Sequence, residues 1–313
     1  MLQVNKKVRI DSFGTRVKKD FKKNKELYLL VLPVVLFYLV FCYKPMYGVI
    51  IAFKDFNPSK GILGSNWIGF KYFTDFFSSY YFVRLMKNTL IISVTSLILG
   101  FPAPILLALL INELRVKWFS RIVQTITYIP HFVSLIVVCG MIVDFSQIGG
   151  VLSSIVEFFI GKQVNLLSVP SYFVPLYVST NIWKEIGFSS IIYIAALMGI
   201  DQQLYEAAQI DGANKWKQLL HVTLPGIAPM IIIMFILAMG GLLNVGYEKI
   251  ILLYNPMIYS TSDVISTFVY RRGLLENNFG YSTAVGLFNS IINFILIYAT
   301  NKISRKVNDT SLW

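Results

Sequence analysis

The residues of this sequence whose types and spacing suit chemistry are polar and aromatic side chains inside long apolar segments. Unpaired polar groups are costly to bury in hydrocarbon, so inside membrane helices they are functional candidates by default. Aromatic faces pack against C–H surfaces, and amide or carboxylate groups hydrogen-bond to hydroxyls. For each single aromatic residue, membrane packing is the competing interpretation. The candidates for lining a solute pathway are Tyr128, Asn181, Trp183, Lys184, Glu185, Asn244, Tyr247 and Glu248.

Lys184 and Glu185 are adjacent in the chain. Successive residues on a helix point about 100° apart. We therefore expect that the two side chains cannot both face one neighbour, and that at least one lines an aqueous cavity or meets another helix. A structural ion pair between subunits is an equal alternative.

No set of residues in the sequence suggests an enzyme or a metal centre. Cys42 and Cys139 lie in apolar runs without a redox motif, and His131 and His221 have no partner at ligand spacing. His131 fits a hydrogen-bonded packing role. The sequence has no G-x-x-x-x-G-K-[ST] run, so we predict a chain that binds no cofactor and is not catalytic alone.

The composition indicates that membrane helices position these residues. Hydrophobic residues make up 56% of the 313 residues and charged residues 14%, against about 25% charged residues in soluble domains. The net charge is +12, and nine of the 28 Lys and Arg residues precede Glu26. A basic tail beside an apolar segment is an orientation signal and a contact for anionic lipid. We therefore predict contact with membrane lipid and no nucleic acid partner.

Apolar segments of about 20 residues predict membrane helices. The sequence therefore predicts an all-α, polytopic membrane protein, with a basic tail over 1–26, a transmembrane domain over 27–306 and a C-terminal tail over 307–313. Lys and Arg gather in the tail and around 115–121, 215–217 and 302–306, which predicts cytoplasmic termini in a cell membrane and an uncleaved first helix. The six predicted spans are 28–53, 88–112, 121–145, 171–199, 226–252 and 280–301.

Two segments outside these spans predict short helices, an interfacial or re-entrant one over 54–87 and a second interfacial one over 150–160. Residues 54–87 are rich in aromatic side chains, and residues 150–160 repeat apolar side chains at helical spacing. Both are expected between spans, on the side opposite the termini.

Residues 200–225, between the fourth and fifth predicted spans, carry small residues, a glycine and a proline at defined positions. Ala207 and Ala208 let another protein approach one helix face closely. Gly212 permits a left-handed backbone that ends the helix, and Pro225 suits the first turn of the next one. We predict a rigid helical elbow, residues 200–225, that projects into the cytoplasm.

The spacing in the elbow resembles the E-A-A loop of permeases of binding-protein-dependent ABC importers. That pattern is E-A-A, three residues, G, nine residues, an aliphatic residue, one residue and L-P, and Val222 supplies the aliphatic residue here. The resemblance implies a type I ABC importer permease fold and an elbow that docks on an ATPase subunit. The residues implied in this coupling are Glu206, Ala207, Ala208, Asp211, Gly212, Leu224 and Pro225.

The same resemblance implies the partners. They are a second homologous permease in a heterodimer, two ATP-binding-cassette ATPase subunits that use ATP and Mg, and an extracellular solute-binding protein.

Three further stretches are similar to the carbohydrate branch of this family: 130–132, 183–188 and 254–256. The similarity implies import of an oligosaccharide or complex glycan fragment by alternating access. A permease for a non-sugar solute is an alternative, because those families share the elbow. An ion-gradient-driven secondary transporter, which would not need the elbow, and a non-transporting scaffold that kept the fold are others.

Overall fold

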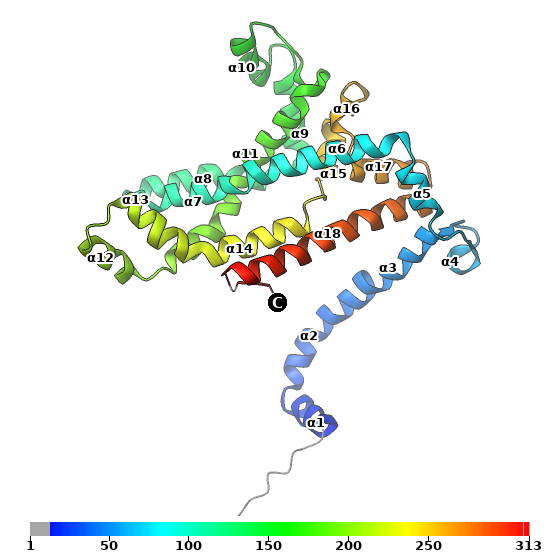
Figure 1. Ribbon diagram of the computed structural model, residues 1–313, viewed down its shortest axis with the longest axis horizontal. Helices are drawn as coiled ribbons and strands as arrows, with labels where there is room; N and C mark the ends of the chain where they lie inside the picture. The colour runs from blue at the N-terminus through cyan, green and yellow to red at the C-terminus, as the bar shows by residue number, and fades with distance from the viewer. Residues whose placement is uncertain (1–12, 309, 313) are drawn as a thin grey trace, which may run out of the picture.

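The computed structural model describes residues 13–308 and 310–312, which form a helical bundle with one small hairpin (Figure 1). The predicted tails over 1–26 and 307–313 therefore lie partly outside the described residues. Five helical runs in the described part are long and apolar enough to cross a membrane: Lys25–Phe53, Tyr80–Asn112, Leu135–Ile160, Lys215–Gly240 and Phe279–Lys306. Pro170–Met198 makes a sixth when it is taken with Gln202–Ile210, from which it is bent by 67°. The all-α, polytopic class is thus confirmed.

The first half of the chain forms the N-terminal helices and the long helix pair that follows them. The hairpin is antiparallel, with Lys54 opposite Trp67. The elements are α1 (Phe13–Lys23), α2 (Lys25–Phe37), the π-helical η1 (Tyr38–Tyr43), α3 (Lys44–Met46), the 3-10 segment η2 (Tyr47–Phe53), β1 (Lys54–Asp55), α4 (Gly61–Gly64), β2 (Asn66–Trp67), α5 (Lys71–Phe77), α6 (Tyr80–Thr95), the π-helical η3 (Ser96–Gly100), α7 (Pro102–Asn112), α8 (Lys117–Phe132), α9 (Leu135–Ser146) and α10 (Val151–Ile160).

The second half contains the central helix and the last long helix. Its elements are the 3-10 segment η4 (Leu166–Ser168), α11 (Pro170–Met198), α12 (Gln202–Ile210), α13 (Lys215–Gln218), the π-helical η5 (Leu219–Thr223), α14 (Leu224–Gly240), α15 (Tyr247–Leu253), the 3-10 segment η6 (Pro256–Ile258), α16 (Tyr259–Ser262), α17 (Ile265–Tyr270), the π-helical η7 (Arg271–Leu275) and α18 (Phe279–Asn308).

Several of the prolines in the long helical runs follow π-helical segments. η1 ends two residues before Pro45, η3 two residues before Pro102, and η5 two residues before Pro225. Proline has no amide N–H, and its ring clashes with the carbonyl four residues earlier. A widened turn lets a helix continue through such a site. Pro225 lies in the first turn of α14, as predicted, although the helical run that contains it starts earlier, at Lys215, and continues to Gly240.

Two predicted spans are wrong as continuous helices. The segment 121–145 breaks after Phe132, where Val133 is extended and the Ser134 side chain caps the next helix by accepting from the Val137 amide at 3.4 Å. The segment 226–252 breaks at Gly240 and resumes only at Tyr247. Apolar periodicity does not detect a cap or a glycine inside an apolar run.

The bounds of the other predicted elements agree better. The second run begins at Tyr80 rather than at residue 88. The surface-helix prediction for 150–160 coincides with α10, and residues 54–87 hold the hairpin, α4, α5 and the start of α6.

α11 is the central helix, since it contributes to two of the three apolar cores. One core joins α11 to α9 and α15, and another joins it to α7 and α14. The third core joins α5, α6, α17 and α18. By contrast, α2 runs away from the bundle (Figure 1), and the apolar window of Lys25–Phe53 has no buried residue. That surface is left to lipid or to another chain.

Candidate functional site: the elbow and the α11 cavity

The elbow forms the end of the molecule that carries α12 and α13 (Figure 1). The side chain of Asp201 caps α12 by accepting from the Gln203 amide at 2.9 Å. Gly212 has φ +76°, so the left-handed backbone predicted there is confirmed. The Asn214 side chain then caps α13 by accepting from the Lys217 amide at 2.9 Å. Both turns of the elbow are therefore fixed by local hydrogen bonds and one glycine.

Further hydrogen bonds tie the two halves of the elbow together. The Tyr205 hydroxyl on α12 and the Thr223 hydroxyl on η5 are 3.0 Å apart. The Gln218 amide donates to the Ala213 carbonyl at 2.9 Å. Gln218 and Thr223 are buried. These contacts make α12 and the start of the next long helix one mechanical unit.

The coupling residues predicted from sequence lie on the accessible side of this unit. Glu206, Ala207, Asp211, Gly212 and Pro225 are exposed, and Ala208 and Leu224 are partly buried.

Sequence reasoning missed two large apolar side chains of the elbow. Ile210 is 86% exposed and Trp216 is 65% exposed. Exposed apolar groups that sit together mark interaction surfaces. Their presence in a short polar segment was the available signal.

Three of the predicted pathway residues line one cavity. This α11 cavity has a volume of about 500 Å³, and Asn181, Glu185 and Asn244 are in its wall together with Tyr177 and Ser96. Asn181 and Glu185 come from α11, whereas Asn244 comes from the break between α14 and α15. The break that was not predicted is thus what brings Asn244 to the cavity.

Asn244 is positioned by the last helix. Its side-chain oxygen accepts from the Asn289 amide at 3.0 Å and from the Asn293 amide at 3.1 Å, both on α18. Asn293 also accepts from the Leu243 backbone amide at 3.1 Å. The broken backbone between α14 and α15 is therefore held by side chains of α18, as a membrane interior requires.

Lys184 and Glu185 both contact α8, so the expectation that they face different neighbours is wrong. Lys184 Nζ donates to the His131 carbonyl at 3.1 Å, and Glu185 Oε2 lies 2.7 Å from His131 Nδ1. The two side chains also pair with each other at 3.0 Å. Long side chains can bend toward a common partner although their Cα–Cβ bonds diverge. His131 stacks on Phe188 with ring centroids 3.8 Å apart, as its predicted packing role requires.

The remaining pathway candidates do not line the α11 cavity. Trp183 is 47% exposed on the outside of α11, and Tyr128 on α8 faces Ser190. Glu248 is exposed. Tyr247 stacks near Tyr270 and lines a separate apolar cavity of about 790 Å³ between η2, α17 and α18.

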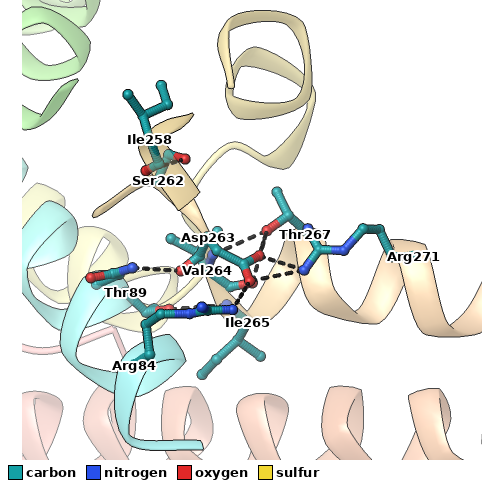
Figure 2. Close-up of polar contacts among 10 residues, drawn as sticks. Arg84, Thr89, Ile258, Ser262, Asp263, Val264, Ile265, Thr267 and Arg271 are labelled. Atoms are coloured by element: carbon teal, nitrogen blue, oxygen red, sulfur yellow. Dashed lines mark hydrogen bonds and ion pairs between the residues drawn. The ribbon is translucent and has the colours of Figure 1, made fainter. Parts of the chain in front are cut away.

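An ion cluster at the other end of the molecule was not predicted (Figure 2). We call the residues Arg84, Asp263, Thr267 and Arg271 the clamp. Asp263 is fully buried and lies 3.0 Å from Arg84 Nη2, and its two oxygens lie 2.7 and 2.9 Å from Arg271 Nη2. The Thr267 hydroxyl donates to the same carboxylate at 3.0 Å. Burial lowers the pKa of Arg271, but the hydrogen bonds and charge of Asp263 raise it by more, so the arginine stays charged.

Backbone contacts reinforce the clamp. The Asn88 amide donates to the Asp263 carbonyl at 2.9 Å, and the Ile265 amide donates to the Thr89 hydroxyl at 3.1 Å. α6 is thereby fixed to the segment between α16 and α17, which is about 175 residues away in the chain. Arg84 and Arg271 read as ordinary loop residues in the sequence, and only the fold reveals their shared partner.

A comparison with known protein families identifies the family of this chain. The sequence model of the binding-protein-dependent transport system inner membrane components matches residues 100–309, a range that includes the elbow, α11 and α18. The chain belongs to this family. It is a multi-pass permease subunit of a bacterial ABC importer and not an enzyme in itself.

Individual relatives of this permease match over nearly its whole length. Protein LplB of Bacillus subtilis (strain 168) is 44% identical over 293 residues, which cover 93% of this chain and 92% of LplB. The polygalacturonan/rhamnogalacturonan transport system permease protein YteP of the same organism is 42% identical over 292 residues. These residues cover 93% of this chain and 91% of YteP.

Solved structures agree with this permease in fold. A chain of a bacterial ABC transporter involved in the import of the acidic polysaccharide alginate superposes with a TM-score of 0.86 at 44% identity, over 94% of this chain and 99% of that one. A second structure of a bacterial alginate ABC transporter, in complex with an alginate pentasaccharide-bound periplasmic protein, gives a TM-score of 0.87 at 43% identity, over 95% of this chain and all of that one. The predicted importer-permease fold is thus confirmed.

Proposed function

We propose that this permease carries an oligosaccharide or a fragment of a complex glycan into the cell, powered by ATP hydrolysis on separate subunits. The observation that carries the proposal is the elbow, a capped and internally bonded unit with exposed apolar side chains, in a chain 42% identical to a polygalacturonan/rhamnogalacturonan permease. A rigid unit of this kind transmits the movement of a partner, whereas a flexible loop would absorb it.

In this proposal the elbow docks on an ATPase subunit in the cytoplasm. Ala207 and Ala208 permit close approach, and Ile210 and Trp216 supply apolar contact. Glu206 and Asp211 offer charge to basic groups, and Gly212, Leu224 and Pro225 set the geometry of the turn. ATP and Mg would be bound by the partner ATPase subunits, not by this chain.

The proposed assembly contains a second, related permease, two ATPase subunits and an extracellular binding protein. The unburied surface of Lys25–Phe53 supports a place for further chains beside the bundle. The alginate transporter structure with its sugar-loaded periplasmic protein supports delivery by a binding protein. Both termini would then be cytoplasmic, on the same side as the elbow.

The α11 cavity is the proposed solute site. Asn181, Glu185 and Asn244 provide amide and carboxylate groups for hydroxyls, and Tyr177 provides an aromatic face. Tyr128, Trp183, Lys184, Tyr247 and Glu248 remain pathway predictions that would need another conformation or the second permease to reach the solute. Alternating access would open this cavity to each side in turn.

The test is transport by the complete complex in proteoliposomes. The two permeases, the ATPase subunits and the binding protein are reconstituted, and uptake of oligogalacturonides is followed with and without internal ATP. We expect uptake that needs ATP and the binding protein and that is unaffected when ion gradients are collapsed. Uptake without ATPase subunits would favour a secondary transporter, and ATP-driven uptake of a non-sugar solute alone would refute the carbohydrate assignment.

A further inference from the structure

Lys249 places a basic side chain in the interior of the bundle. The residue lies on α15 and is 4% exposed. It is next to Ile250, which belongs to the same apolar core as Cys139 of α9 and Tyr177 of α11. Lysine is rarely buried this deeply, and inside a membrane protein such a residue is functional by default.

The surroundings of the amine consist of acceptors, which suit an ammonium ion. Lys249 Nζ donates to the Tyr177 carbonyl at 3.0 Å and to the Thr180 hydroxyl oxygen at 3.0 Å. The Thr180 hydroxyl itself donates to the Leu176 carbonyl at 2.6 Å, so its oxygen is free to accept. The amine also lies 4.7 Å from the centroid of the Tyr177 ring, within cation–π distance. Three donors therefore meet two oxygens and one π face.

No carboxylate forms an ion pair with Lys249 within the described part of the chain. The ion pairs found among residues 13–308 and 310–312 do not include Lys249. The carboxylate of the α11 cavity, Glu185, is already paired with Lys184 and bonded to His131. Around this cavity two lysines thus face one carboxylate, which leaves an excess positive charge in a region of low dielectric.

The charge lies directly behind the wall of the α11 cavity. Tyr177, whose ring and carbonyl contact Lys249, is a wall residue of that cavity, and so is Gly246, three residues before Lys249. Because Lys249 is buried within its own chain, it acts on a solute through its electric field and not by contact.

We propose that Lys249 is a specificity-determining residue that makes the α11 cavity favour anionic solutes, so that the imported oligosaccharide contains uronate. This inference rests on the proposed function. A carboxylate in the cavity would balance the excess charge, whereas a neutral sugar of the same shape would leave it unbalanced.

The experiment compares two solutes on the same protein. ATP-driven uptake of trigalacturonate and of its methyl ester is measured in proteoliposomes that contain the complete complex, with binding protein saturated by each sugar. The variants are K249M, K249R and T180V, with exposed Lys71→Met as the control for losing a lysine. The ratio of the two rates does not depend on how much complex is folded.

We expect K249M to lower the ratio of trigalacturonate to ester uptake about tenfold, the effect of one unit charge over roughly 10 Å at an effective dielectric constant of about 20. K249R and T180V keep the charge and should keep the ratio, as should K71M. An unchanged ratio in K249M, or an equal fall in T180V, overturns the inference and leaves the proposed function intact. A wild-type complex that imports the methyl ester but not trigalacturonate also overturns the inference, whereas a complex that imports no oligosaccharide at all refutes the proposed function, and the inference fails with it.

Discussion

The elbow, which carries α12 and α13, lies far from α6 and α17, which the clamp joins (Figure 1), and the two sites are built in opposite ways. In the elbow, the bonds that fix the turn join residues no more than 18 positions apart, such as Tyr205 and Thr223. In the clamp, Asp263 meets Arg84 across 179 positions and Asn88 across 175. One site is a local device, and the other exists only when the whole chain has folded.

The elbow is built to keep its shape by its own local bonds. The clamp is built to hold distant helices of the bundle together. A coupling unit that pushes against a partner has to be stiff without support from the rest of the fold. A buried ion cluster that joins α6 to α17 forms only when the chain is folded. It then resists separation of the ends of two long helices. The predictions below test this division of roles, beginning with the largest expected effect.

Asp263→Asn should destabilise the whole protein. The variant removes the fully buried counter-ion of Arg84 and Arg271, whose own side chains are partly exposed, and removing one partner of a buried pair costs up to about 3–5 kcal/mol. The thermal unfolding midpoint of the purified complex in detergent measures the effect. Glu276→Gln is the matched control, because Glu276 pairs with Arg272 at the same end but is partly exposed, where ion pairs contribute little. Equal midpoints for the two variants would show that the clamp does not support the fold.

The same division explains how much could be predicted from sequence. The left-handed backbone of Gly212 in the elbow was predicted correctly, because E-A-A, glycine and L-P are local signals. The helical class and the long helices at 170–198 and 279–308 follow from apolar length alone. The break at Ser134 and the break after Gly240 were not predicted, because a single cap or glycine is a weak signal inside an apolar run.

The α11 cavity was predicted only in part. Asn181, Glu185 and Asn244 were named because they are polar residues in apolar segments, and they do line one cavity. Trp183 was predicted as an aromatic residue of the same apolar segment, but it does not line the cavity, since residue type does not give the direction of a side chain. The burial of Lys249 could not be predicted, because the residue stands near the end of an apolar segment, where lysine side chains normally reach water.

Gly212→Val should uncouple ATP hydrolysis from uptake. Glycine adopts φ +76° without strain, whereas a β-branched residue there costs about 1–2 kcal/mol and reshapes the turn. A Cβ at this position would meet no atom within 4 Å, so the effect is on the backbone and not a clash. We expect uptake to fall at least tenfold while the ATPase subunits stay bound, as measured by uptake and by co-purification.

Two variants sharpen this result. Gly69→Val introduces the same strain, at φ +62° and again without a clash, far from the elbow, and should leave coupling intact. Gly212→Asn should recover most of the uptake, because asparagine tolerates the left-handed region. Loss of uptake in G69V as large as in G212V would mean that backbone strain anywhere disturbs transport.

Tyr205→Phe should weaken coupling without breaking it. The variant removes the hydrogen bond to Thr223 and keeps the ring, and one neutral hydrogen bond contributes about 0.5–1.5 kcal/mol. We expect about a threefold fall in solute imported per ATP hydrolysed, with the thermal midpoint unchanged. Tyr80→Phe, at an exposed tyrosine, is the control. A drop in midpoint without a change in coupling would move Tyr205 from the elbow's function to the stability of the fold.

Lys215→Met should have the smallest effect, and it is the sharpest test of the elbow as a local unit. Lys215 forms an ion pair from the elbow to the segment after α7, with its Nζ 3.3 Å from Glu113. The two side chains are 68% and 59% exposed, so water and salt screen the pair. We expect uptake to change by less than twofold at physiological salt, and the double variant Lys215→Glu with Glu113→Lys to behave like the wild type. If K215M abolished coupling and the charge-swapped pair restored it, the elbow would depend on a distant segment for its rigidity, and the contrast with the clamp would be lost.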